Sequence, residues 1–266
     1  MKSPPPPCSV LVSSCDAYRD IWPVFFRLYF KHAEGLKMPV RLVADQCSYA
    51  DERVEMLHTG EDPSWTTSLA RALAQVPEPY VLFLQEDFLL SKPINIPLFE
   101  EILRQFHAIQ ALTLEIDIRD VNGPAIEDTW FRESNAENLR SGLNATLWRR
   151  EFLQEIVSPP GLNIWQAETR VRDCLRAGRR GMLFLTPETP PVISYVESVK
   201  GGFWKPDAVR FLRESGLEPD LRNRPCPPQG NGFFPKLARS LLKRWMRTRR
   251  APAPPGSMVQ PMAEES

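Results

Sequence analysis

Two adjacent carboxylates, Glu86 and Asp87, come just after the entirely apolar segment 80–84 (YVLFL). A short apolar run of this kind is typical of a strand buried in a parallel sheet, so the pair is expected at the edge of that sheet. Carboxylate oxygens suit Mg²⁺ or Mn²⁺, which take one or two carboxylates and complete their octahedron with phosphates and waters. The pair therefore predicts a metal site at which the bound metal would also contact the diphosphate of a nucleotide. A solvated acidic turn has the same pattern.

Polar residues also end two earlier apolar segments. Ser13 ends the run 9–13 (SVLVS) and Asp16 follows it, and Asp45 follows the segment 39–44 (PVRLVA). In open α/β sheets, ligands bind beyond the carboxyl ends of the strands. Asp16 and Asp45 could there accept hydrogen bonds from a base N–H or from ribose hydroxyls. Aspartate is also an ordinary turn residue, so each position alone is a weak signal.

A third candidate is Glu168, in the segment 163–168 (NIWQAE) that opens a predicted helix. As a general base it would accept a proton from a hydroxyl nucleophile. The structural alternative is a carboxylate that stabilises the positive end of the helix dipole.

Several other chemistries lack their motifs. Neither GxGxxG nor GxxxxGK[ST] occurs, which disfavours a nicotinamide dehydrogenase and a P-loop ATPase. The three histidines have no zinc-site spacing, and no GxSxG motif is present. The five cysteines contain no CxxC pair and indicate reduced thiols in a cytosolic chain.

The hydrophobic pattern alternates between strand and helix signals. Strands are predicted at 9–13, 39–44, 80–84, 112–118 and 182–185. Helices are predicted at 19–31, 66–76, 98–107, 148–157, 165–177 and 206–215. This alternation predicts an α/β fold with a mainly parallel sheet flanked by helices.

The segments SVLVSSCDAYRDIWPVFF, PVRLVAD and YVLFLQEDFLL resemble the nucleotide-binding half of a GT-A glycosyltransferase. With ATLWRREFL, NIWQAE and YVESVKGGFW, the layout is similar to family 2-like enzymes of bacterial surface-polysaccharide biosynthesis, over residues 8–216. The chain departs from the family at Gln85, where an acidic residue is usual, and at Ala167, before the single acidic residue Glu168. It also lacks a C-terminal histidine in the position of the family's third metal ligand.

The resemblance implies a role for each candidate. Asp87 would bind Mg²⁺ or Mn²⁺, and Glu168 would be the catalytic base. The nucleotide-sugar would contact residues at the same edge of the sheet: Ser13, Asp16, Asp45, Glu86 and Lys200. Lys200 corresponds to a loop near the diphosphate, and its structural alternative is a solvated loop lysine.

The predicted activity is metal-assisted, inverting transfer of a sugar from a nucleotide diphospho-sugar to a hydroxyl of a glycan or lipid-linked acceptor. One alternative is a nucleotidyltransferase on a related fold, which usually has a glycine-rich loop after the first strand. The other is a catalytically silent relative that scaffolds polysaccharide assembly at the membrane.

The charge distribution divides the chain. The formal net charge is zero, which argues against a nucleic-acid partner. The segment 233–250 (FFPKLARSLLKRWMRTRR) has an apolar and a basic stripe at helical spacing, a pattern typical of a helix on a membrane surface. A helix that packs on the body would show the same stripes. We therefore expect a GT-A-like domain at 8–216, a basic amphipathic extension at 217–250 and a disordered tail at 251–266. The expected location is the cytoplasm, at the inner membrane face.

A chain truncated before Phe233 should stay folded and act on a soluble acceptor analogue, but lose binding to anionic vesicles. Each basic residue near an anionic surface contributes about 1 kcal/mol, and salt should weaken the attraction. Vesicle sedimentation at low and high salt measures this. If truncation unfolds the protein, the segment belongs to the core. If the full chain does not bind anionic vesicles at low salt, the membrane interpretation fails.

Overall fold

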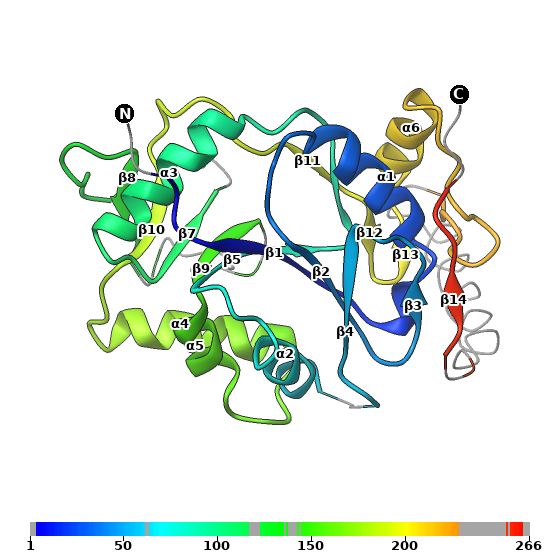
Figure 1. Cartoon of the computed structure of the whole chain (residues 1–266), viewed down its shortest axis with the longest axis horizontal. Helices are drawn as coiled ribbons and strands as arrows, with labels where there is room; N and C mark the ends of the chain where they lie inside the picture. The colour runs from blue at the N-terminus through cyan, green and yellow to red at the C-terminus, as the bar shows by residue number, and fades with distance from the viewer. Residues whose placement is uncertain are drawn as a thin grey trace.

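The chain forms one α/β domain around an eight-stranded sheet of order β4-β2-β1-β5-β9-β7-β10-β8 (Figure 1). The computed structural model describes residues 4–61, 64–116, 123–135, 137, 143, 145–228, 254 and 256–262. Six of these eight strands run in the same direction; β9, which lies between β5 and β7, and β8, at one end of the sheet, run opposite to them. The predicted fold class, a mainly parallel sheet flanked by helices, is confirmed.

The sheet strands are β1 (Cys8–Ser13), β2 (Val40–Ala44), β4 (Val54–His58), β5 (Tyr80–Gln85), β7 (Thr113–Glu115), β8 (Phe131–Glu133), β9 (Thr146–Arg149) and β10 (Met182–Leu185). Short pairs are formed by β3 (Ser48–Tyr49) with β14 (Met258–Val259), β6 (Phe88–Leu90) with β11 (Tyr195–Glu197), and β12 (Val199–Lys200) with β13 (Phe203–Trp204). The helices are α1 (Trp22–His32), α2 (Trp65–Leu73), α3 (Ile96–Ala108), α4 (Arg150–Val157), α5 (Ile164–Arg176) and α6 (Pro206–Glu214), with a 3₁₀ turn η1 (Asp16–Tyr18).

The two faces of the sheet bury two separate apolar clusters. Val10 of β1 and Leu82 of β5 pack with α1, α3 and α6, whereas Leu11 and Phe83 pack with α2, α4 and α5. Figure 1 shows the two groups of helices on opposite sides of the sheet. Successive side chains of a strand point to opposite faces, so a continuous apolar run such as 80–84 fits a strand covered on both sides.

The structure differs from the sequence prediction around Trp148. Residues 146–149 form β9, which pairs antiparallel with both β5 and β7, and the helix α4 begins only at Arg150. Trp148 is fully buried and stacks on Phe152 across this boundary. Its apolar neighbours satisfy helix and strand periodicity equally well over so few residues, so pattern alone did not place the boundary.

Residues 217–228 pack against the body of the domain. The backbone N–H of Trp204 donates to the carbonyl of Pro225 at 3.1 Å, and Arg224 is fully buried. In the segment 251–266, predicted to be disordered, residues 256–262 are ordered and include β14, parallel to β3. Val259 and Met262 pack on the larger apolar cluster, which explains why this segment is held. The predicted basic helix 233–250 lies outside the described residues.

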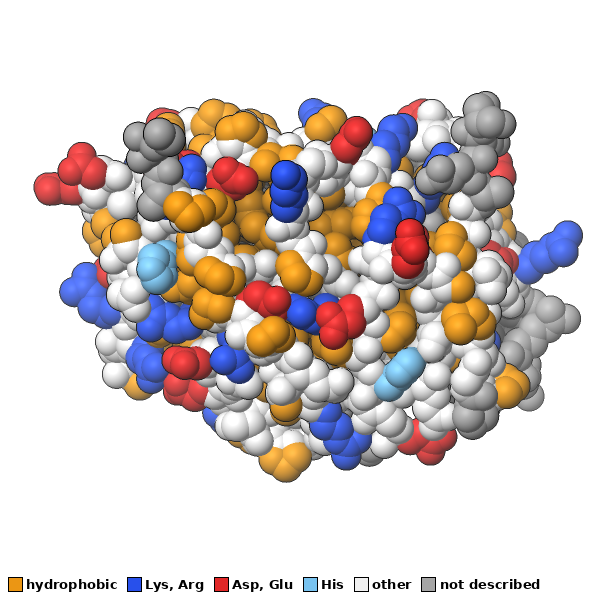
Figure 2. Space-filling model, in the orientation of Figure 1, with side chains coloured by type: hydrophobic (Ala, Val, Ile, Leu, Met, Phe, Trp, Pro, Cys, Tyr) orange, Lys and Arg blue, Asp and Glu red, His pale blue; other side chains and the backbone are white. Residues whose placement is uncertain are grey.

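No helix among residues that the structure describes is both long and apolar enough to cross a membrane. On the face seen in Figure 2, acidic and basic side chains are interspersed.

A chain ending at residue 253 should remain folded but lose the partners of strand β3. The amides of Ser48 and Ala50 donate to the carbonyls of Ser257 and Val259, each at 2.9 Å. Two lost backbone hydrogen bonds should lower the free energy of unfolding by roughly 1–3 kcal/mol. Hydrogen exchange should accelerate at these two amides, whereas a chain ending at residue 262 should match the full chain. Unchanged exchange in the shorter chain would show that β14 contributes nothing. Deleting 233–250 alone separates this effect from membrane binding.

Candidate functional site

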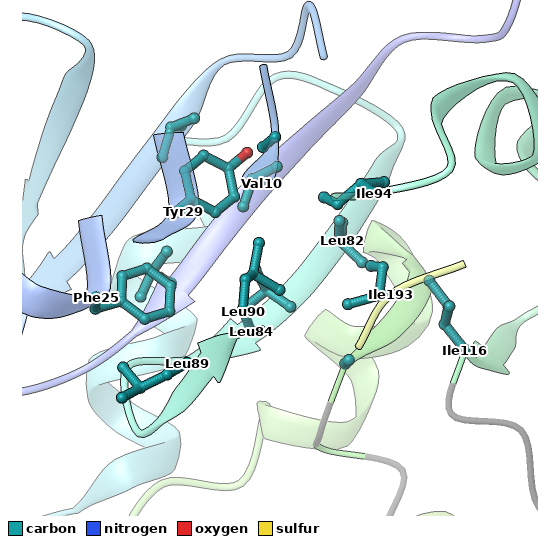
Figure 3. Packing of buried hydrophobic residues seen from close by; sticks show 14 of the residues in the cluster. Val10, Phe25, Tyr29, Leu82, Leu84, Leu89, Leu90, Ile94, Ile116 and Ile193 are labelled. Atoms are coloured by element: carbon teal, nitrogen blue, oxygen red, sulfur yellow. The ribbon is translucent and has the colours of Figure 1, made fainter. Parts of the chain in front are cut away.

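The Glu86–Asp87 turn is anchored in the core on both sides. β5 ends at Gln85, and β6 begins at Phe88, so the two carboxylates occupy the whole connection. Leu84 before the turn and Leu90 after it are both buried. Figure 3 shows them beside each other, near Phe25 and Tyr29 of α1. The side chain of Gln85 donates to the carbonyl of Leu143 at 2.6 Å, which fixes the start of the turn. These contacts hold the acidic pair at the sheet edge and oppose its movement into solvent.

Burial changes the chemistry of both acids. It raises the pKa of Glu86 well above its usual value, and the neighbouring Asp87 carboxylate raises it further. Burial and the carboxylate of Glu197 raise the pKa of Asp87 to about 6. The Asp87 atom Oδ1 is buried without a hydrogen-bond partner among the described residues. A buried charge without a partner is unfavourable, so this oxygen is suited to a cationic ligand.

Two cations that the sequence analysis did not single out lie near the acidic turn. Arg224 lowers the pKa of both Glu86 and Asp87, and Lys205 lowers that of Asp87. The Lys205 ammonium also pairs with Glu197 at 2.6 Å. By contrast, Lys200 is exposed on β12. Lys205 is the better placed of the two lysines to meet an anionic group at Asp87. No local signal in the sequence distinguishes Lys205 from Lys200, because the folded hairpin decides which of the two lies near Asp87.

Asp16 and Asp45 do meet, and each binds the other's loop. The Asp16 carboxylate accepts hydrogen bonds from the backbone amides of Asp45, Gln46 and Cys47, at 3.0–3.2 Å. The Asp45 carboxylate accepts one from the amide of Asp16 at 3.1 Å. The Asp16 carboxylate is therefore engaged in shaping the two loops that follow β1 and β2.

Ser13 ends β1 and is also engaged. Its hydroxyl accepts a hydrogen bond from the indole N–H of Trp65 at 3.2 Å. Trp65 in turn lies edge-on to Phe83 of β5. This contact places the start of α2 against the same sheet edge.

Glu168 of α5 lies near the same edge, close enough to Glu115 of β7 for the two carboxyl groups to interact. In the sheet, Thr146 of β9 is paired with Phe83 of β5 and with Glu115, the last residue of β7. Burial raises the pKa of Glu168 to about 7; Arg172 opposes this rise, and the nearby Glu115 carboxylate adds to it. At neutral pH, Glu168 is therefore poised to exchange a proton, as a general base must be.

The position of Glu168 is set by the way α5 begins. Asn163 caps this helix through a capping box with Gln166. Thr66 of α2 exchanges hydrogen bonds with the backbone of Leu162 at 3.0–3.3 Å, which ties the starts of α2 and α5 together. The helix has no acidic residue in its first turn. Stabilisation of the helix start is thus supplied by Asn163 and Gln166, and Glu168 is not needed for it.

The site fits a metal that takes few protein ligands. Among the residues that the structure describes, no group of three histidine, cysteine, aspartate or glutamate side chains is arranged to hold a metal. Mg²⁺ and Mn²⁺ are commonly bound by one or two carboxylates together with phosphate oxygens and waters. The unpartnered Asp87 oxygen matches this mode, with the rest of the shell left to a diphosphate and water.

Comparisons with known proteins found structures but no sequence relatives. No protein-family model matches the chain, and no curated protein matches it. S. aureus TarS is similar over 78% of this chain and 38% of its own, at 16% identity and TM-score 0.44. A UDP-glucose pyrophosphorylase solved with UDP-glucose is similar over 72% and 92%, at 10% identity and TM-score 0.44. A CMP-2-keto-3-deoxy-manno-octonic acid synthetase solved with CTP is similar over 72% and 93%, at 14% identity and TM-score 0.38.

The chain thus spans less than half the length of the intact TarS structure. With TM-scores below 0.5, these likenesses assign no function to it.

Replacing Asp87 by Asn should abolish metal-dependent nucleotide binding without destabilising the fold. Because the folded-state pKa is raised from 3.8 to about 6, the wild type loses stability as pH rises through this window. Asn cannot ionise, so at pH 7.5 the variant should melt at the same temperature as the wild type or higher, and near pH 4 any such advantage should vanish.

Thermal melting at both pH values and calorimetry with nucleoside diphosphates and Mn²⁺ check this. Asp207→Asn, on the exposed side of α6, is the matched control. Unchanged nucleotide binding by Asp87→Asn, or an unfolded variant, would remove Asp87 from the metal site.

Proposed function

We propose that this chain is a glycosyltransferase that moves a sugar from a nucleotide diphospho-sugar to a hydroxyl of a glycan or lipid-linked acceptor. One observation carries the proposal: two acidic sites with raised pKa values lie toward one end of the sheet, one in the turn after β5 and the other on α5, near Glu115 at the end of β7. Asp87 has a buried oxygen suited to a cation, and Glu168 has a pKa of about 7. Separate acidic groups tuned in this way indicate separate roles in one reaction.

The donor would lie over the acidic turn. Asp87 would hold Mg²⁺ or Mn²⁺, which when bound would neutralise charge on the diphosphate. Lys205 would contact a diphosphate oxygen, since its ammonium already lies in the field of Asp87. Glu86, whose raised pKa favours its protonated form, could donate a hydrogen bond to a ribose or sugar hydroxyl. Asp45 would face the nucleoside from the loop that Asp16 shapes.

The acceptor would approach from the side of α5. Glu168 takes the proton of the acceptor hydroxyl, and the oxygen forms a bond to the anomeric carbon. The bond from that carbon to the diphosphate breaks, and its electron pair leaves with the nucleoside diphosphate. Attack opposite to the leaving group inverts the anomeric configuration. Trp165, three residues before Glu168 on the same helix, is 72% exposed and offers an aromatic surface to a sugar ring.

A nucleotidyltransferase is less well supported by the loop after β1. Residues 13–20 (SSCDAYRD) contain no glycine. Their Asp16 carboxylate is engaged with the amides of the neighbouring loop. Backbone amides that cradle a triphosphate usually come from a glycine-rich turn.

The test is incubation of the full chain with a panel of nucleotide-sugars and Mn²⁺, with separate assays for nucleoside diphosphate and pyrophosphate. Slow release of nucleoside diphosphate, accelerated by a glycan acceptor, is expected. Pyrophosphate release with a nucleoside triphosphate and sugar phosphate would indicate the nucleotidyltransferase. No turnover and no nucleotide-sugar binding would favour a silent scaffold.

Glu168→Gln should keep donor binding and slow transfer by about 10²–10⁴-fold, the usual contribution of general base catalysis. Only the ionised carboxylate accepts a proton, so the wild-type rate should rise with pH up to about 7 and then level off. The residual rate of the variant should not show this rise with pH. Glu155→Gln, an exposed acid of α4 that pairs with Arg179, is the control. Near-normal transfer by Glu168→Gln would place the base elsewhere.

A further inference from the structure

Arg224 is a fully buried arginine whose main partner lies 204 residues earlier in the chain. Its Nε and Nη2 atoms donate to the two carboxylate oxygens of Asp20, each at 2.9 Å. This is the two-bond, fork-to-fork geometry that makes an arginine–carboxylate pair directional.

The same guanidinium holds two backbone segments. Its Nη1 donates to the carbonyl of Gly202 at 2.9 Å, and its Nη2 donates to the carbonyl of Ala17 at 3.2 Å. Its central carbon lies 4.5 Å from the centroid of the Tyr18 ring. A lysine has one charged nitrogen and no planar fork, so it cannot make this set of contacts together.

The two segments border the acidic turn. Ala17 belongs to η1; burial raises the pKa of Tyr18 in this turn, and the nearby Glu86 and Asp87 carboxylates raise it further. Gly202 lies in the turn between β12 and β13. This hairpin is tied to the acidic turn, since the amide of Ser198 donates to the Asp87 carbonyl at 2.7 Å and the amide of Lys205 to the Ser198 carbonyl at 2.8 Å. Gly201 and Gly202 have φ values of +59° and +87°, so the turn has a conformation that few other residues adopt.

We infer that Arg224 is a positioning residue for the nucleotide-sugar: it fixes η1 and the β12–β13 hairpin beside Glu86 and Asp87, so that donor binding depends on its two-bond contact with Asp20. The inference rests on the proposed function. A buried ion pair is weak evidence for stability, because well-packed apolar residues can often replace it at no cost. Its geometry is better explained by the need to hold two loops at one site.

The experiment compares Arg224→Lys, Asp20→Asn and the double variant with the wild type. Arg224→Lys keeps the charge but loses the fork, and should raise the Kd and KM for the nucleotide-sugar about 10–100-fold, the range for residues that orient ligand-binding groups. The kcat at saturating donor should change by less than about threefold, because no group that touches the reacting atoms is altered. The double variant should bind the donor no more weakly than the more impaired single variant, since both single substitutions remove the same contact between Arg224 and Asp20. Arg213→Lys, in an exposed pair with Glu218, is the control.

Hydrogen exchange of the same variants provides a readout that does not need the donor. Exchange should accelerate in both 16–20 and 199–204 while the amides of β1 and β5 stay protected. Unchanged donor affinity in folded Arg224→Lys, or a loss of kcat alone, would overturn the inference. Loss of protection across the whole sheet in both single variants would show a purely structural role.

If the wild type binds no nucleotide-sugar, the proposed function fails. Whether Arg224 holds the two segments in place is then decided by exchange alone: faster exchange in both segments supports it, and a change in one or neither refutes it.

Discussion

The site depends on keeping the Glu86–Asp87 turn buried between two apolar strand segments. β5 and β6 are inserted in the same cluster, so moving the carboxylates into solvent would pull Leu84 or Leu90 out of the core. Fully burying a leucine is worth roughly 1.5–3 kcal/mol relative to leaving it exposed, which opposes such a movement. The fold therefore keeps two carboxyl groups buried, although burial disfavours their charged forms and raises their pKa values. Their chemistry follows from the apolar residues on either side.

The rest of the edge is built from reciprocal contacts between loops. Asp16 and Asp45 join the loops after β1 and β2, and Thr66 and Leu162 join the starts of α2 and α5. Each contact links segments far apart in sequence and satisfies backbone groups that the strand and helix ends leave open. The side chains that could bind a ligand therefore lie on loops that these hydrogen bonds hold in place.

The sequence pattern predicted several of the residues at this edge of the sheet, but it did not predict which side chains they contact. Glu86, Asp87 and Glu168 follow from an apolar strand and a capped helix, and they lie at the carboxyl ends of strands or beside them. Lys200 was chosen because it matches a loop near the diphosphate in the family that the chain resembles, whereas Lys205, five residues later, is the lysine near Asp87. Hairpin geometry decides which of two nearby lysines faces inward, and no local pattern encodes it. The hydroxyl of Ser13 likewise accepts from Trp65, a contact that strand periodicity does not reveal.

Local periodicity and residue type are enough to predict the alternation of strands and helices, the apolar runs buried on both faces and the position of the acidic turn. They do not predict that Arg224 lies beside that turn, that β9 runs antiparallel between β5 and β7, or that residues 258–259 return to pair with β3. Such contacts join residues tens to hundreds of positions apart. Their free energy depends on which surfaces meet after folding, and a local pattern contains no information about that.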